Sequence, residues 1–308
     1  MRWRKGSSIS DEYEPGWRPY PLWGRVPPSP KPRLWVNALL LAATILTTMA
    51  AGAMQSGVNI LARPELLVKG IPFSGTLLLI LGVHETAHYV AARQWGVRAT
   101  LPYFIPMPTF IGTLGAFIKI RSPIPNRNAL LDMGVSGPLT GFAVATVLSA
   151  VGLARSEVIQ IPEAVHGGTF FLGNSLLFSF LTRVVVGNLP EGADLMLHPV
   201  AFAGWIGLFV TAINLLPVGQ LDGGHVIYAL FGQRHRVIGR GVLLALVPLG
   251  IFWQGWFVWA FLLLVVLGMK HPPPSDGYQP LDPRRRLMGF AAIGVFLLSF
   301  TPVPFRFG

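Results

Sequence analysis

Long apolar runs, uncharged except for Glu85 in the second, recur along the chain and are separated by more polar connections that carry most of the basic residues. A helix needs about 20 such residues to cross the hydrocarbon core of a bilayer. The runs near or above this length are residues 34–62, 71–92, 133–154, 199–221, 241–269 and 287–305. The run 167–182 is shorter, and the sequence leaves the role of residues 167–187 open. The pattern predicts an all-α polytopic membrane protein with about six to seven transmembrane helices.

The composition agrees with this prediction. Of the 308 residues, 52% are hydrophobic and 12% are charged, whereas soluble domains carry about 25% charged residues. So few charges cannot cover a core of this size in water, which excludes a soluble globular protein. The net charge of +11 lies in hydrophilic connections without interleaved aromatic residues, so we expect no nucleic-acid partner. The chain has no cysteine, so its chemistry must use other side chains.

The basic residues predict an orientation, because Lys and Arg near the ends of spans stay on the cytoplasmic side. Most of the 24 basic residues lie inside if the N-terminus is cytoplasmic. Residues 241–269 must then enter and return, as two short helices hinged between Pro248 and Gly255, although a single tilted span is an alternative. We expect residues 1–33 to be a disordered cytoplasmic segment and residues 34–305 to form one integral membrane domain.

The second apolar run contains the sequence His84-Glu85-Thr86-Ala87-His88. Residues four apart lie on one face of an α-helix, so both imidazoles can bind one Zn²⁺ while Glu85 reaches the water beside it. Ionisable residues inside a membrane span are costly and by default indicate a functional site. We therefore predict His84 and His88 as zinc ligands and Glu85 as the general base of a hydrolytic reaction.

Catalytic zinc sites use three protein ligands, so we expect one more acid or histidine at the same depth. Asp222 fits, because it follows Pro217 and precedes two glycines, which should break the helix there. Irregular backbone is tolerated at membrane depth where it lines a cavity or packs on protein. A plain turn with an interfacial aspartate is the alternative, but the predicted orientation brings Asp222 to the level of the two histidines.

Two motifs together resemble those of the site-2 protease family of intramembrane zinc metalloproteases. They are the His-Glu-x-x-His sequence and the later sequence Asn-Leu-Leu-Pro-Val-Gly-Gln-Leu-Asp-Gly-Gly, which runs from Asn214 to Gly224. Gly137-Pro138, in the third run, is similar to the Gly-Pro element of that family. Residues 95–132, which separate the second and third runs, are too few for an inserted PDZ domain. The chain is therefore similar to the short form of the family.

The resemblance implies a role for each motif residue. The zinc ligands would be His84, His88 and Asp222, and the general base would be Glu85. Asn214 would be a polar group near the substrate carbonyl or the developing oxyanion. The acidic residues Asp11, Glu12 and Glu14 argue against a transit peptide, so we expect a bacterial plasma membrane.

Residues 109–120 predict a small membrane-associated β segment between the second and third spans. They contain β-branched and aromatic residues with Gly112 and Gly115, and they follow three prolines. A free strand edge there could bind a substrate as an added strand, with the two glycines allowing close backbone approach. An interfacial loop without strands is the alternative.

Two further polar residues lie close to these motifs in the sequence. His225 follows the second motif and could support the site without binding the metal. Asp132 lies near Arg127 and is interpreted as an interfacial charge or a residue at the start of a helix.

The sequence thus predicts an intramembrane zinc endopeptidase whose partners are the lipid bilayer and membrane-spanning protein substrates. The alternative is a divalent metal transporter that uses the same His and Asp residues. A transport site has no need for a base one residue after a ligand, which favours the protease. The sequence leaves the substrate, the trigger for cleavage and the oligomeric state open.

Overall fold

The computed structural model describes residues 33–160, 170–267 and 273–307. Contacts divide the chain into Met1–Arg33 and Leu34–Gly308. The N-terminal segment predicted at residues 1–33 lies outside the described residues, except for Arg33. The statements below concern the second unit.

The second unit is mostly helical, as the apolar runs predict. Its α-helices are α1 (Leu34–Gln55), α2 (Ile71–Gln94), α3 (Arg127–Leu153), α4 (Leu176–Val185), α5 (Pro199–Asn214), α6 (Asp222–Phe231), α7 (His235–Phe252), α8 (Gly255–Leu262) and α9 (Pro283–Ser299). Shorter helical segments are Pro64–Gly70, Gly232–Arg234 and Leu263–Leu267. The strands are β1 (Tyr103–Pro106), β2 (Thr113–Phe117), β3 (Glu157–Gln160), β4 (Phe170–Leu172), β5 (Ala193–Met196) and β6 (Phe305–Phe307).

Among the described residues, 4 helical runs are long and apolar enough to cross a membrane: Leu34–Gln55, Pro64–Gln94, Arg127–Leu153 and Asp222–Phe252. The helices Leu176–Val185, Pro199–Asn214 and Gly255–Val265 are apolar but shorter. The chain is therefore a membrane protein with several spanning helices, and the count of six to seven spans stays a prediction. The expected hinge is present, because α7 ends at Phe252 and α8 starts at Gly255.

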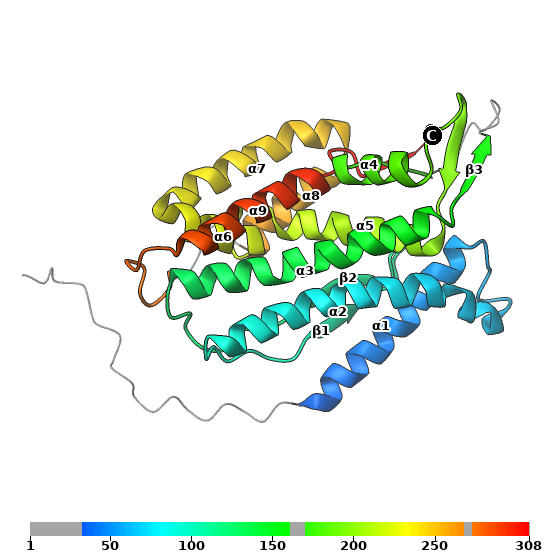
Figure 1. Ribbon diagram of the computed structural model, residues 1–308. Helices are drawn as coiled ribbons and strands as arrows, with labels where there is room; N and C mark the ends of the chain where they lie inside the picture. The colour runs from blue at the N-terminus through cyan, green and yellow to red at the C-terminus, as the bar shows by residue number, and fades with distance from the viewer. Residues whose placement is uncertain (1–32, 161–169, 268–272, 308) are drawn as a thin grey trace, which may run out of the picture. The chain divides into compact units, whose positions relative to one another are not determined.

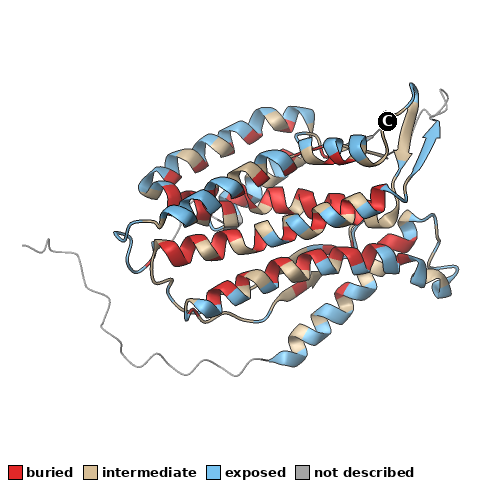
Figure 2. Ribbon diagram, in the orientation of Figure 1, coloured by how far each residue is buried: buried red, intermediate tan, exposed pale blue. Residues whose placement is uncertain are grey.

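Helix α3 lies in the middle of the helices that carry the predicted site residues, in contact with α2, α5, α6 and α9 (Figure 1). Most of α5 is buried, whereas α1 and α7 are exposed over much of their surface (Figure 2). The exposed positions on these outer helices include large apolar side chains such as Leu39, Leu244 and Ile251. Apolar side chains at such positions suit contact with lipid, since water would disfavour them.

The predicted β segment, residues 109–120, contains the second strand of a hairpin whose first strand precedes it, so the plain-loop alternative is wrong. Strands β1 and β2 pair antiparallel, with Tyr103 opposite Phe117 and Phe104 opposite Ala116. The strand pairs β3–β5 and β4–β6 were not predicted from the sequence. Their strands have 3 or 4 residues each, too few to show an alternating pattern.

Helix α1 holds the hairpin from its β1 side. The Asn37 side chain donates to the Pro102 carbonyl at 2.9 Å, and the Gln55 side chain donates to the Phe110 carbonyl at 2.7 Å. A Cβ at Gly112 would lie 2.5 Å from the Thr47 carbonyl oxygen. Gly112 thus allows a close approach, but to α1 and not to a free strand edge. With α1 against β1, strand β2 contacts α2.

Candidate metal centre

Helix α2 carries both histidines of the first motif on its buried face. His84 and His88 are 4% and 7% exposed, and their Nε2 atoms lie 3.1 Å apart. The four-residue spacing on a straight helix accounts for this approach, because such residues are one turn apart. The helix therefore presents two imidazole nitrogens at one point.

The break between α5 and α6 presents Asp222 to the same point. Helix α5 ends at Asn214, and α6 starts with Asp222 as its first residue, where the helix dipole favours a negative charge. Close packing of the two helix ends requires the glycines that follow. A Cβ on Gly223 would overlap the Leu215 carbonyl, and one on Gly224 would overlap the Gly219 carbonyl.

The three predicted ligand atoms form a compact triangle. The Oδ2 atom of Asp222 lies 3.2 Å from His84 Nε2 and 3.2 Å from His88 Nε2. Ligands about 2.0–2.1 Å from a tetrahedral zinc ion are about 3.3 Å from one another. The donor set of two imidazoles and one carboxylate, at this spacing, fits zinc with a fourth position left for water or substrate.

A hydrogen bond behind the triangle supports a metal between these atoms. The Nδ1 atom of His88 lies 2.7 Å from the Met133 carbonyl oxygen and donates to it. In a neutral imidazole, the proton on Nδ1 leaves a lone pair on Nε2. That lone pair faces the carboxylate of Asp222, and a cation between them removes the repulsion. Such a bond to the outer nitrogen is typical of histidines that bind zinc.

Two glycines of α3 make room for the imidazoles. A Cβ on Gly137 would overlap the His88 ring, and a Cβ on Gly141 would lie 2.9 Å from His84 Nδ1. Gly137 was singled out in the sequence through the family resemblance, but Gly141 was missed. Its spacing of four residues from Gly137, which puts both on one helix face, is the signal that could have found it.

Glu85 and Asn214 lie beside the triangle. Glu85 is 6% exposed, and the backbone N–H of Ile118, just after β2, lies near its carboxylate. The Nδ2 atom of Asn214, at the end of α5, lies 3.5 Å from His84 Nε2. The structure therefore brings together all five residues that the sequence singled out for the site.

Asp132 lies near the start of a helix, as one of its two interpretations expects, and its partner is not the nearby Arg127. Asp132 is the sixth residue of α3 and accepts hydrogen bonds from Trp95 and from Arg285 of α9. Arg127 instead donates to backbone carbonyls at the end of α6. His225 lies against α3, where a Cβ on Gly134 would be 2.9 Å from its Cβ, and it is outside the metal-binding group found among the described residues.

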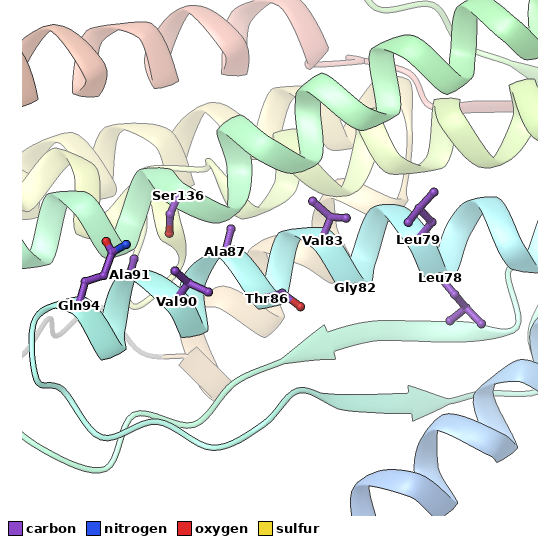
Figure 3. Close-up of a pocket in the computed structure, with 10 residues that line it drawn as sticks. All are labelled: Leu78, Leu79, Gly82, Val83, Thr86, Ala87, Val90, Ala91, Gln94 and Ser136. Atoms are coloured by element: carbon purple, nitrogen blue, oxygen red, sulfur yellow. The ribbon is translucent and has the colours of Figure 1, made fainter.

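A groove of about 590 Å³ follows another face of α2 (Figure 3). Residues such as Gly82, Thr86 and Val90 line it, and Ser136 contributes from α3. None of the predicted metal ligands lines it. The metal centre is thus separate from this groove.

Comparison with known proteins identifies the family. The model of peptidase family M50 matches residues 72–251, which include the α2 motif and Asp222. Among curated proteins, the chain is 30% identical over 245 residues to the probable zinc metalloprotease EGY2, chloroplastic, of Arabidopsis thaliana; the match covers 79% of this chain and 44% of that protein. It is 32% identical over 248 residues to the probable zinc metalloprotease EGY1, chloroplastic, of the same plant, covering 76% of this chain and 43% of that protein.

The chain spans less than half the length of these relatives. Their names place them in chloroplasts, which conflicts with the expected bacterial plasma membrane. The matched residues contain the complete triangle of ligand atoms with Glu85 beside it, and no PDZ domain is indicated within the match. The chain therefore belongs to peptidase family M50, the site-2 protease family that its two motifs resemble.

Proposed function

We propose that this chain is an intramembrane zinc endopeptidase that cleaves membrane-spanning segments of other proteins. The observation that carries the proposal is a buried carboxylate, Glu85, directly beside a set of three zinc-binding side chains on apolar helices. His84, His88 and Asp222 would hold the ion. When bound, zinc supplies a Lewis acid that polarises the scissile carbonyl and lowers the pKa of water toward about 7.

The remaining steps belong to residues of the chain. Glu85 takes a proton from the attacking water and passes it to the leaving nitrogen. Asn214 is close enough to the ligand atoms for its amide to donate to the oxyanion that develops on the substrate. The Met133 carbonyl keeps the His88 imidazole in one tautomer and orientation.

Metal transport is the less favoured function. A transport site needs ligands that an ion can leave, and it gains nothing from a buried carboxylate directly beside the ligands. The relatives carry the name zinc metalloprotease, which also favours the peptidase. The test is cleavage of purified single-span substrates in detergent or in lipid vesicles, with zinc content measured on the same sample.

A helical substrate must unwind before cleavage, because its carbonyls are otherwise engaged in hydrogen bonds. We propose that the unwound segment is added along the free edge of β2. The backbone N–H of Ile118 lies on the side of β2 near Glu85. Alternate residues of a strand turn their amides to the same edge, so Ala116 should offer its N–H there too. An added strand would then run past the general base.

Ala116→Pro should lower cleavage at least tenfold while zinc stays bound, because proline removes the N–H that would bind the substrate backbone. Ala116→Val keeps that N–H and is the matched control, for which we expect near-normal activity. A scan of proline from Gly112 to Ile118 should impair cleavage most strongly at alternate positions. Equal activity of Ala116→Pro and Ala116→Val would contradict strand addition.

We also propose that the loop between α2 and α3 faces the cytoplasm when the chain is made in bacterial cells. The proposal rests on the basic residues Arg98, Lys119 and Arg121, which lie in that loop without an acidic residue. In this cysteine-free chain, a single cysteine at the exposed position Pro123 should resist an impermeant thiol reagent added to intact cells. A cysteine at exposed Ala62, between α1 and α2, should be labelled. The reverse pattern would overturn this orientation.

A further inference from the structure

We propose that Arg127 and Asp132, at the start of α3, are positioning residues that set the distance between the helix carrying the two histidines and the helix carrying Asp222. The inference rests on the proposed zinc site, and neither residue contacts the three ligand atoms. It concerns how the ligand triangle is assembled from helices that are far apart in the sequence.

Arg127 holds the helix that carries Asp222. Its guanidinium donates to the Ala229 carbonyl from Nη2 at 2.5 Å and from Nε at 3.1 Å, and to the Leu230 carbonyl at 3.4 Å. These carbonyls lie in the last turn of α6, where helical partners are lacking and a positive charge is favourable. Helix α6 has only 10 residues. Holding its C-terminal end therefore constrains Asp222 at its N-terminal end.

Asp132 holds the helix that carries the histidines. Its Oδ2 atom accepts a hydrogen bond of 2.9 Å from the indole N–H of Trp95, the residue just after α2. Arg285 of α9 donates to both carboxylate oxygens, at 2.9 and 3.0 Å, and its guanidinium lies 5.4 Å from the centre of the Trp95 ring. One carboxylate thus joins three helices.

The next residue of α3 contacts a metal ligand directly. The Met133 carbonyl accepts the hydrogen bond from His88 Nδ1. Trp95 follows His88 on the same helix by about two turns. The bonds Trp95–Asp132 and His88–Met133 therefore fix the register of α2 against α3 at two points. A slip between the helices would also move Gly137 away from the His88 ring that it accommodates.

The first two turns of α3 therefore contact both the helix that carries the two histidines and the helix that carries Asp222. Arg127 binds the C-terminal end of α6, and Asp132 and Met133 bind residues of α2 and of its C-terminal end. Gly134, between them and Gly137, lets the Asp222 end of α6 approach, since its Cβ would lie 3.3 Å from the Asp222 carbonyl oxygen. Groups that hydrogen-bond a ligand change metal affinity by about 10–100-fold when they are removed. Arg127 and Asp132 act on the ligands through the helices that carry them.

The test uses cobalt(II) in place of zinc, because zinc has no visible absorption and cobalt reports the geometry of its ligands. We expect Arg127→Gln and Asp132→Asn to weaken cobalt affinity about 10–100-fold and to shift the visible absorption. Peptidase kcat should fall with little change in KM. Arg127→Lys can still donate to one carbonyl and should lie between wild type and Arg127→Gln. Arg286→Gln, an exposed arginine beside Arg285, is the charge-matched control and should behave as wild type.

Trp95→Phe is the variant to measure if the first two do not fold. It keeps an aromatic ring beside Arg285 and removes the indole N–H that donates to Asp132. Its cobalt affinity should fall about tenfold. Wild-type cobalt affinity and absorption in all variants that fold would overturn the inference, whatever happens to thermal stability, and would make these contacts structural only. If the wild-type protein binds cobalt but cleaves no substrate, the proposed function is rejected. The cobalt affinities and spectra of the variants then decide this inference by themselves.

Discussion

Glu85→Gln should retain zinc and lower peptide hydrolysis by several orders of magnitude. Glutamine has nearly the same shape as glutamate, but it cannot take a proton from water. Loss of a general base alone costs about 10²–10⁴ in rate. The measurement is single-turnover cleavage of a single-span substrate, with the zinc content of the same preparation determined by atomic absorption.

Glu65→Gln is the matched control for this experiment. Glu65 is an exposed residue of the short helix before α2 and lies outside the ligand group, so its replacement should leave cleavage unchanged. Cleavage at the wild-type rate by Glu85→Gln would remove Glu85 as the base. Loss of zinc from Glu85→Gln would instead make Glu85 a ligand and leave the base unassigned.

Asp222→Ala should lose both zinc and activity. The carboxylate is one of three ligands, and the remaining two imidazoles belong to a single helix. With only these two, the ion would lack the three protein ligands typical of a catalytic site. We expect zinc to be removed from this variant by a chelator concentration that leaves wild type loaded, and cleavage to be undetectable.

The control for Asp222→Ala is Glu157→Gln, which removes an exposed carboxylate from β3. It should keep wild-type zinc content and cleavage. Retention of full zinc occupancy by Asp222→Ala, under the same chelator challenge, would exclude this carboxylate as a ligand. His84→Ala and His88→Ala should resemble Asp222→Ala, whereas Asn214→Ala should keep zinc and lose part of the rate, because we propose that Asn214 acts on the substrate.

The chemistry of the site could be predicted because it depends on local spacing. His84 and His88 are one helical turn apart whatever surrounds them, and Glu85 is fixed next to them. Pro217 and Gly219, between α5 and α6, break the helix by their own backbone properties, so the position of Asp222 at a helix start was also predictable. Strand β2, within the predicted residues 109–120, followed from residue types in the same way, whereas its partner β1 lies before them.

Amino-acid sequence alone therefore determined the apolar helices, the helix break at Asp222 and the set of side chains for the metal, since each depends on neighbours within a few residues. Tertiary structure decided which face of α3 meets the histidines, and so gave Gly141 its role. It also decided that Gly112 packs on α1, that Arg127 binds the end of α6 and that Asp132 pairs with Arg285. These contacts join residues far apart in the chain, and helical periodicity identifies a face without specifying the partner that covers it.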